Sequence, residues 1–253
     1  RAIQLDPKNG GFQGNLGIVL RQQGKIDEAL TAYEMAAQLA PEAGSFYALA
    51  ISQKEAGRLS DAAASFQKAL VFSPRQPDLL RQLCGVLKQE ERYDEALQAC
   101  RQWLEIEPEN PVAVHMHAAL SEQGMPDRAS QEYVREVFDR YAANFDRQLQ
   151  ELEYKAPRLL KKVLKQHFSA ETADLVVLDA GCGTGLCGQI LRPYASRLEG
   201  VDLSEKMLEK ARQTNLYDEL TAGELTDFLA EHPETYDLIV CIDTLNYFGD
   251  LAA

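Results

Sequence analysis

The first half of the chain repeats a short segment four times at a nearly constant interval. The segments AIQLDP, AAQLAP, ALVFSP and WLEIEP end in prolines that are 34, 33 and 34 residues apart, at Pro7, Pro41, Pro74 and Pro108. Small residues recur in the same phase ahead of the last three prolines, at Ala29, Ala62 and Ala96. A period of this length predicts an array of similar units, each of which buries its apolar face against its neighbours.

Each repeated unit has the pattern of two antiparallel helices. The alanine allows the two helices to approach closely, and an aromatic residue one turn later, Tyr33 or Phe66, fills the groove beside it. Proline ends the second helix because it has no backbone N–H. The pattern resembles the tetratricopeptide repeat, although Gln13 stands at its tryptophan position and Glu91 at its turn glycine. The resemblance implies a concave groove for a protein or peptide; three unrelated helical hairpins are the alternative.

Residues 111–147 resemble a degenerate last repeat. Its first helix is NPVAVHMHAALSEQG, the turn is GMPD at 124–127, and a longer second helix is expected over 128–149. His115 and His117 are two positions apart on a helix and point to different faces, so we do not interpret them as a metal-binding pair.

From about residue 174, short apolar runs alternate with helical segments. The runs LVVL and LIVCI lack polar alternation, which is typical of buried strands in a parallel sheet covered by helices on both faces. We predict strands over 174–180, 197–204, 216–224 and 235–248, a helix over 184–195, and a helix that begins after Ser204 as its N-cap. Ligands of such sheets bind at the carboxyl ends of the strands.

The predicted fold class is an all-α repeat array followed by an α/β, Rossmann-like fold with a parallel sheet. The expected domains are the repeats over 1–130, a helical linker and lead-in over 131–173, and the first part of a ligand-binding domain over 174–253.

The stretch LDAGCGTGLCGQIL contains four glycines directly after the first predicted strand. Gly183, Gly185 and Gly188 fit the G-x-G-x-x-G pattern of dinucleotide sites, so a nicotinamide-dependent oxidoreductase is one interpretation. A different adenosine-bearing ligand is the other, because a carboxylate, Asp179, ends the strand and the tight stretch begins at Gly181.

An acidic residue followed by G-x-G-x-G resembles the class I S-adenosylmethionine-dependent methyltransferases. The resemblance implies S-adenosylmethionine as cofactor, with Gly181, Gly183 and Gly185 against its methionine and ribose. Asp202, at the end of the second strand, is expected to accept hydrogen bonds from the ribose hydroxyls, and Asp179 to face the ammonium group.

The same resemblance implies contacts to the adenine. Glu224, after the third strand, is expected to accept from the adenine amino group, and Leu225 to offer its backbone N–H to the ring. Asp243, just past the fourth strand, is the candidate catalytic residue that orients or deprotonates the methyl acceptor; a capping role in its own loop is the alternative.

The segment VFDRYAANFDRQLQELEYKAPRLL resembles the lead-in of bacterial methyltransferases that carry tetratricopeptide repeats, in which FD-x-YA-x-x-FD precedes the first strand. Tyr141 and Phe145 lie four residues apart on one helical face. They form either a lid over the ligand or ordinary packing.

The composition limits the classes of partner. The net charge of −13 repels the phosphate backbone of nucleic acids, and no apolar stretch is long enough to span a bilayer, so we expect no nucleic-acid or membrane partner. The five cysteines have no metal-ligand spacing, which favours reduced thiols, no metal and a cytoplasmic location.

We therefore predict a methyltransferase whose repeats recruit a protein partner or substrate. The alternative is a non-catalytic repeat scaffold with a cofactor-binding or degenerate methyltransferase fold. Because the family's sheet has further strands beyond the fourth, residues 1–253 are expected to be a fragment that is inactive alone and associates through an open sheet edge.

Overall fold

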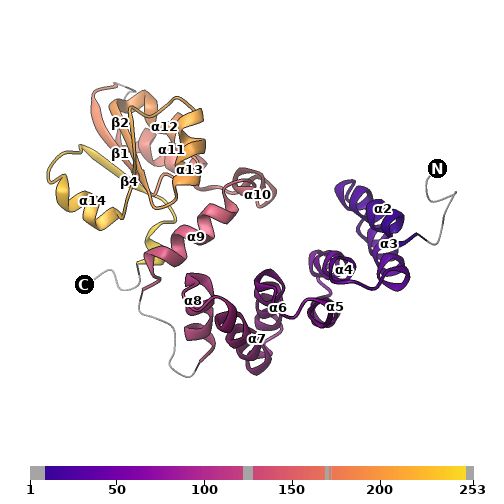
Figure 1. Cartoon of the computed structure of the whole chain (residues 1–253). Coiled ribbons are helices and arrows are strands. Elements are labelled where there is room, and N and C mark those ends of the chain that lie inside the picture. The colour runs from indigo at the N-terminus through magenta and orange to yellow at the C-terminus, as the bar shows by residue number, and fades with distance from the viewer. Residues whose placement is uncertain (1–8, 122–127, 169–170, 172, 249–253) are drawn as a thin grey trace. The chain divides into compact units, whose positions relative to one another are not determined.

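A computed structural model describes residues 9–121, 128–168, 171 and 173–248 of the chain. The residues divide into two compact units, 1–125 and 126–253. Figure 1 colours the helical first unit from indigo to purple and the second unit from magenta to yellow.

The first unit is an array of helix pairs whose helices pack mainly on their sequence neighbours. Its described helices are α2 (Gly10–Gln22), α3 (Ile26–Leu39), α4 (Ala43–Glu55), α5 (Leu59–Phe72), α6 (Pro77–Gln89), α7 (Tyr93–Ile106) and α8 (Pro111–Leu120). The predicted alanines and aromatic residues form its core: Ala29, Tyr33, Ala62, Phe66 and Ala96 are all buried. The helical-pair interpretation of the period is confirmed.

Close packing explains a small residue in α2. A Cβ built on Gly17 would lie 2.7 Å from the Tyr33 ring of α3, closer than real Cβ contacts. The turns between paired helices require a positive φ, which is 75° at Gly24 and 74° at Gly57. Glu91 adopts the same left-handed conformation, with a φ of 59°. The same turn therefore forms at this position with glutamate in place of glycine.

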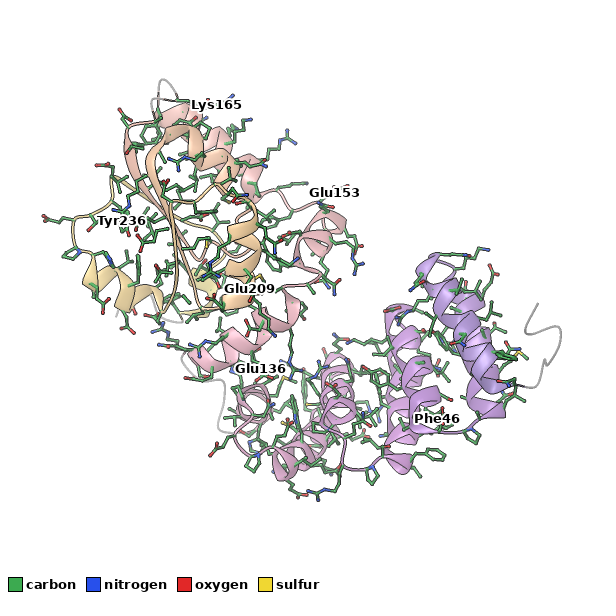
Figure 2. The ribbon with its side chains drawn as sticks, turned by 45° about the horizontal axis from the view of Figure 1, so that its top comes forward. Phe46, Glu136, Glu153, Lys165, Glu209 and Tyr236 are labelled. Carbon is green, nitrogen blue, oxygen red and sulfur yellow. The ribbon has the colours of Figure 1, made fainter. Side chains whose placement is uncertain are left out.

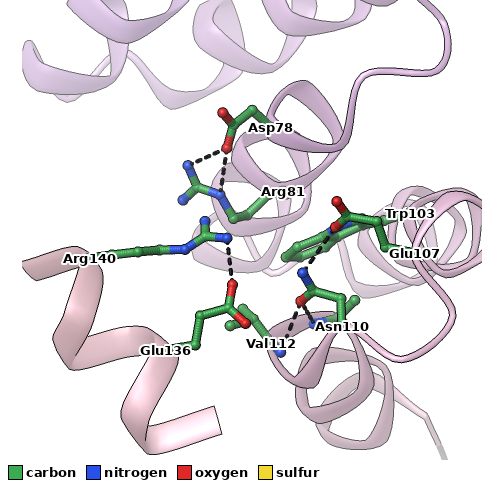
Figure 3. A network of polar contacts seen from close by, with 9 residues as sticks. Asp78, Arg81, Trp103, Glu107, Asn110, Val112, Glu136 and Arg140 are labelled. Carbon is green, nitrogen blue, oxygen red and sulfur yellow. Dashed lines mark hydrogen bonds and ion pairs between the residues drawn. The ribbon is translucent and has the colours of Figure 1, made fainter. Parts of the chain in front are cut away.

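The junction between α7 and α8 is held by side chains (Figure 3). Glu107 accepts hydrogen bonds from the Trp103 indole N–H at 2.8 Å and from the Asn110 amide at 2.9 Å. Asn110 in turn accepts from the backbone N–H groups of Val112 and Ala113 and thereby caps α8. The cap explains why a new helix begins at Pro111, directly after Asn110.

The predicted last repeat is wrong in its second half. The expected single helix over 128–149 is two helices, α9 (Gln131–Tyr141) and α10 (Phe145–Glu151), and α9 packs on α13 (Glu205–Gln213) of the second unit. Buried Ala142 follows α9, and Asn144 has a non-helical conformation at the start of α10. Contacts with distant loops thus override the helical pattern. The turn predicted at 124–127 lies outside the described residues.

The second unit contains a four-stranded parallel sheet with the strand order β3-β2-β1-β4. The strands are β1 (Leu175–Ala180), β2 (Ala195–Asp202), β3 (Glu219–Ala222) and β4 (Leu238–Cys241). In Figure 1, α14 (Leu225–Glu231) covers one face, and α11 (Ala156–His167), α12 (Gly188–Leu191) and α13 lie on the other. The predicted fold class, an all-α array followed by an α/β Rossmann-like fold, is confirmed.

Alternate residues of β1 serve the two faces of the sheet. Val177 packs in the cluster with Leu164 and Leu191, whereas Leu178 packs with Leu225 and Phe228. Both faces are therefore apolar, as the unalternated sequence runs indicate. Within the described residues β4 is an edge strand that pairs only with β1, and Ile239 is exposed there.

Three predicted elements are shorter than expected, and one of them is the third strand, which was expected over 216–224 and spans Glu219–Ala222. Glycine-rich backbone occupies the start of the helix expected over 184–195, which leaves α12 and a short 3-10 helix over Arg192–Tyr194. The strand expected over 235–248 ends at Cys241, because Asp243 has a φ of 55° and a 3-10 helix follows at Leu245–Tyr247. Ser204 caps α13 as predicted and accepts from the Met207 N–H.

Candidate functional site

The glycine loop after β1 needs glycine for its backbone conformation. Gly181, Gly183 and Gly185 have φ values of 74°, 55° and 85°, a region that other residues enter at an energetic cost. A Cβ on Gly181 would overlap the Thr244 side chain, whereas no described heavy atom lies within 4 Å of a Cβ built on Gly183. Protein thus fills the Cβ direction of Gly181, whereas the Cβ direction of Gly183 is open. Both glycines line the same cavity.

Asp202 holds this loop in place. One oxygen of its carboxylate accepts from the Gly183 N–H at 2.9 Å, and the other accepts from the Ser204 N–H at 2.8 Å. Burial raises the pKa of Asp202, although these two hydrogen bonds favour the ionised form. The carboxylate at the end of β2 therefore links the loop after β1 to the cap of α13.

Asp179, at the end of β1, is only 3% exposed. Its carboxylate accepts a hydrogen bond from the Tyr217 hydroxyl at 2.6 Å. Burial raises the pKa of Asp179 to about 6, the Tyr217 hydrogen bond opposes this, and the nearby Asp202 carboxylate adds to it. Asp179 also lines the cavity, so the protein holds a poorly solvated acid at its wall.

Glu224 caps α14, which begins at Leu225. Its carboxylate accepts from the Asp227 N–H at 2.9 Å and from the Thr226 hydroxyl, and it forms an ion pair with Arg128. Burial alone would raise the pKa of Glu224, but these three partners outweigh it and lower the pKa below its ordinary value. The guanidinium of Arg128 also lies 4.5 Å from the centre of the Phe248 ring.

The cavity has a volume of about 470 Å³ and brings together most of the predicted site residues. Asp179, Gly181, Gly183, Asp202, Glu224, Leu225 and Asp243 all line it. Gly185 shapes the loop and faces Tyr217 and Ala211. Tyr141 is 49% exposed and lies outside the described lining, whereas Phe145 belongs to the lining.

Asp243 lies at the cavity beside a partner that the sequence did not indicate. The Tyr154 hydroxyl, which follows α10, donates a hydrogen bond to the Asp243 carboxylate. Burial raises the pKa of Tyr154, and the hydrogen bond to the carboxylate raises it further. Four aromatic residues of the lead-in and of the segment after β4 also line the cavity: Phe138, Phe145, Tyr247 and Phe248.

All five cysteines are free thiols. Burial raises the pKa of the Cys182 thiol, and it raises the pKa of Cys187 to about 12. Neither thiol is activated as a nucleophile. Within the described ranges, no group of three or more His, Cys, Asp or Glu side chains could hold a metal ion. In the part of the chain that the structure describes, no helix is both long enough and apolar enough to cross a membrane.

Comparisons with known proteins agree with both halves of this description. A family model described as "Methyltransferase domain" matches residues 177–253, and two models described as "Tetratricopeptide repeat" match residues 12–43 and 54–120. The chain carries tetratricopeptide repeats and a methyltransferase domain. The methyltransferase match favours S-adenosylmethionine over a nicotinamide dinucleotide as the ligand of the glycine loop.

Curated relatives are methyltransferases as well. Methyltransferase-like protein 27 of Homo sapiens is 35% identical over 125 residues, which are 49% of this chain and 50% of that protein. Ubiquinone biosynthesis O-methyltransferase of Thiobacillus denitrificans is 35% identical over 91 residues, 33% of this chain and 38% of that enzyme. The chain thus spans half the length of the first relative and less of the second.

Solved repeat proteins share a more distant likeness. The MamA protein superposes with a TM-score of 0.44 at 19% identity and covers 61% of this chain and 79% of that chain. The first tetratricopeptide domain of Spaghetti (RPAP3), bound to a peptide of HSP90, gives a TM-score of 0.40 at 18% identity over 46% and 94% of the two chains. Because both TM-scores are below 0.5, the repeats are identified by their period and by the family models, and not by these superpositions.

Proposed function

We propose that the second unit binds S-adenosylmethionine in the 470 Å³ cavity and belongs to an active methyltransferase. The observation that carries this proposal is the glycine loop. The Gly183 N–H is fixed by Asp202 at 2.9 Å, and the open side of Gly183 leaves room for a ligand against the backbone. The residues present fit such a ligand, because its cationic groups would meet a wall that contains the carboxylates of Asp179, Asp202 and Asp243.

Asp202 is the proposed ribose contact. Each of its oxygens accepts one backbone N–H, and each carboxylate oxygen can accept a second hydrogen bond. A vicinal diol would therefore find two acceptors whose position the protein has already fixed. Asp179 is the proposed partner of the ammonium group, whose positive charge would favour the ionised form of this buried acid.

Glu224 and Leu225 are the proposed adenine contacts. The carboxylate of Glu224 already caps α14 and pairs with Arg128, so the amino group of adenine would share an occupied acceptor. The N–H of Leu225 lies at the first position of α14, where the helix supplies no acceptor for it. We therefore give the larger share of adenine recognition to the backbone of Leu225.

Bound S-adenosylmethionine supplies a methyl group activated by the sulfonium. The residues of this chain then have to align the acceptor and receive its proton. Asp243 is the proposed proton acceptor, with the Tyr154 hydroxyl donating to it and fixing its orientation. The aromatic residues that line the same cavity would favour an apolar or aromatic acceptor.

The repeats are proposed to recruit a protein partner or substrate, because stacked helix pairs expose a long groove that suits a peptide or a helix. The rival function is a repeat scaffold that binds the cofactor without turnover. A radiolabelled methyl-transfer assay over a range of acceptors separates the two. The first acceptors to test are phenols, because relatives are named O-methyltransferases, followed by peptides.

Calorimetry on residues 1–253 tests the cofactor proposal directly. S-adenosylmethionine or S-adenosylhomocysteine is expected to bind, and the reduced nicotinamide dinucleotide is expected not to. Binding of the dinucleotide alone would overturn the assignment. Cofactor binding without turnover on any acceptor class would favour the scaffold.

A further inference from the structure

The lead-in repeats the dipeptide Phe-Asp seven residues apart. Phe138 and Asp139 lie near the end of α9, and Phe145 and Asp146 open α10. Figure 2 labels Glu136 on α9 and Glu209 on α13, the helix on which α9 packs. The function proposed above assigns no role to the two aspartates of these dipeptides.

The two aspartates contact the two loops that form the cofactor cavity. Asp146 accepts a hydrogen bond from the Thr184 hydroxyl at 2.5 Å, and Thr184 lies between Gly183 and Gly185 in the glycine loop. Asp139 accepts from the Ser204 hydroxyl at 2.5 Å, and the N–H of the same Ser204 donates to Asp202. The hydroxyl-bearing residues Thr184 and Ser204 are buried.

The two phenylalanines lie in the wall of the same cavity. The Phe138 and Phe145 rings meet edge to face, with centroids 6.1 Å apart. Phe138 also meets Tyr247, after β4, at 5.5 Å. In each dipeptide the aspartate thus contacts a loop that borders the cavity, and the phenylalanine ring forms part of the cavity wall.

We propose that Asp139 and Asp146 are positioning residues of the methyl-donor site. This inference rests on the proposed function of the cavity. A carboxylate is a stronger acceptor than a neutral group, so the Asp146 contact holds the glycine loop at its middle. The Asp139 contact fixes the cap next to Asp202. The apparent affinity for the ligand is proportional to the fraction of time that the free loop spends in its binding conformation. Contacts that hold the loop in that conformation therefore tighten binding.

The test measures the affinity of the full 253-residue chain for S-adenosylhomocysteine by calorimetry. Asp146→Ala and, separately, Thr184→Val are each expected to weaken binding about tenfold, the usual effect of losing a charge-assisted hydrogen bond. The double variant is expected to bind about as weakly as either single variant, because both changes remove one contact. Asp139→Ala is expected to weaken binding to a similar extent.

Matched controls come from the same helices. Glu151→Ala on α10 and Glu136→Ala on α9 remove carboxylates that pair within their own helix, with Arg147 at 3.8 Å and with Arg140. Both controls are expected to keep wild-type affinity. Asp146→Asn retains an oxygen that can accept from Thr184, and it is expected to recover most of the affinity lost in Asp146→Ala.

Three results would overturn the proposal: wild-type affinity in Asp146→Ala, additive losses in the double variant, or no recovery in Asp146→Asn. If an alanine variant does not fold by circular dichroism, Thr184→Val and Asp146→Asn complete the test. A wild-type chain that binds no S-adenosylhomocysteine would instead refute the cofactor proposal itself, and the positioning role would fall with it.

Discussion

The two units differ in how far apart in the sequence their contacting residues lie. In the repeat unit the helices pack mainly on the helices that precede and follow them. In the second unit the contacts around the cavity join residues far apart in the chain, such as Arg128 and Glu224, which are 96 positions apart. The repeat unit therefore depends on contacts between helices that are close in sequence. The cavity of the second unit depends on contacts that form only when the fold brings distant residues together.

This difference separates the effects expected from mutations. A change in one repeat alters packing with its immediate neighbours, as nearest-neighbour models of repeat proteins describe. A change at a strand end of the second unit acts on loops from several elements at once. The following experiments test this contrast, from the largest expected effect to the smallest.

Phe66→Ala is expected to have the largest effect on the repeats. Phe66 is fully buried in the core cluster of α4 to α7, where its ring meets Tyr47 of α4 with centroids 6.0 Å apart. Loss of such a ring destabilises by roughly 3–5 kcal/mol. Urea unfolding followed by the fluorescence of Trp103, the one tryptophan of the chain, measures the change. Phe72→Ala, at a ring that is 50% exposed, is the control and should cost less than about 1 kcal/mol.

The same Phe66→Ala variant also tests the contrast between the units. S-adenosylhomocysteine affinity should remain unchanged in conditions where the variant is still folded. A large loss of affinity would show that the cavity depends on repeat packing and would contradict the separation of the two units.

Asp179 is expected to make the stability of the second unit depend on pH. Burial raises its pKa from 3.8 to about 6 in the folded protein. Well below pH 3.8 the folded and unfolded forms are both protonated, so the group has little effect there. As the pH rises from 4 through 6, the unfolded form ionises first and the folded state loses about 3 kcal/mol relative to it.

Asp179→Asn should abolish this loss, since the amide stays neutral and its oxygen can still accept from the Tyr217 hydroxyl. The measurement is the free energy of unfolding of both proteins between pH 4 and pH 8, with a direct titration of the carboxyl by NMR. An Asp179 that titrates near pH 4 would contradict the assigned burial effect.

Asp202→Ala should weaken S-adenosylmethionine binding by roughly 1–3 kcal/mol, because a charged acceptor is lost from the proposed ribose site. The variant also frees the Gly183 N–H, which loosens the glycine loop. Calorimetry measures the loss, and Glu209→Ala on α13 serves as a control at a nearby helix. Unchanged affinity in a folded Asp202→Ala variant would rule out the ribose contact.

Much of the architecture could be predicted because its signals are local. The proline period predicted the helix pairs, and apolar runs with acidic ends predicted Asp179 and Asp202 at neighbouring strand ends, which the parallel pairing of β1 and β2 brings together. The N-cap at Ser204 required only the residues around it. These features follow from short-range chemistry and from the rule that parallel strands end at the same edge.

The rest of the site depends on pairs that no local pattern connects. Tyr154 meets Asp243 across 89 positions, and Tyr217 meets Asp179 across 38. The long helix predicted over 128–149 was wrong for the same reason, since Asp139 and Asp146 contact distant loops on either side of the break. A duplicated Phe-Asp dipeptide was the available signal for this region.

Glu91→Gly is expected to have the smallest effect, and it tests whether the repeat turns obey a purely local rule. In the three turns the N–H of Gly24, Gly57 or Glu91 donates to the carbonyl oxygen three residues earlier, so the turns are equivalent. Among these three positions only Glu91 carries a side chain, and it adopts the positive φ at 59°. Glycine should relieve the strain and stabilise the repeats by roughly 0.5–1 kcal/mol.

The reverse change, Gly57→Ala, provides the matched comparison. No described heavy atom lies within 4 Å of a Cβ built on Gly57, so any loss of stability comes from the backbone alone. A loss of about 1 kcal/mol is expected, again measured by urea unfolding with Trp103 fluorescence. Opposite signs for the two variants would establish that the turn responds to local conformation alone. Destabilisation by Glu91→Gly would instead reveal that the Glu91 side chain contributes to the stacking of α6 on α7.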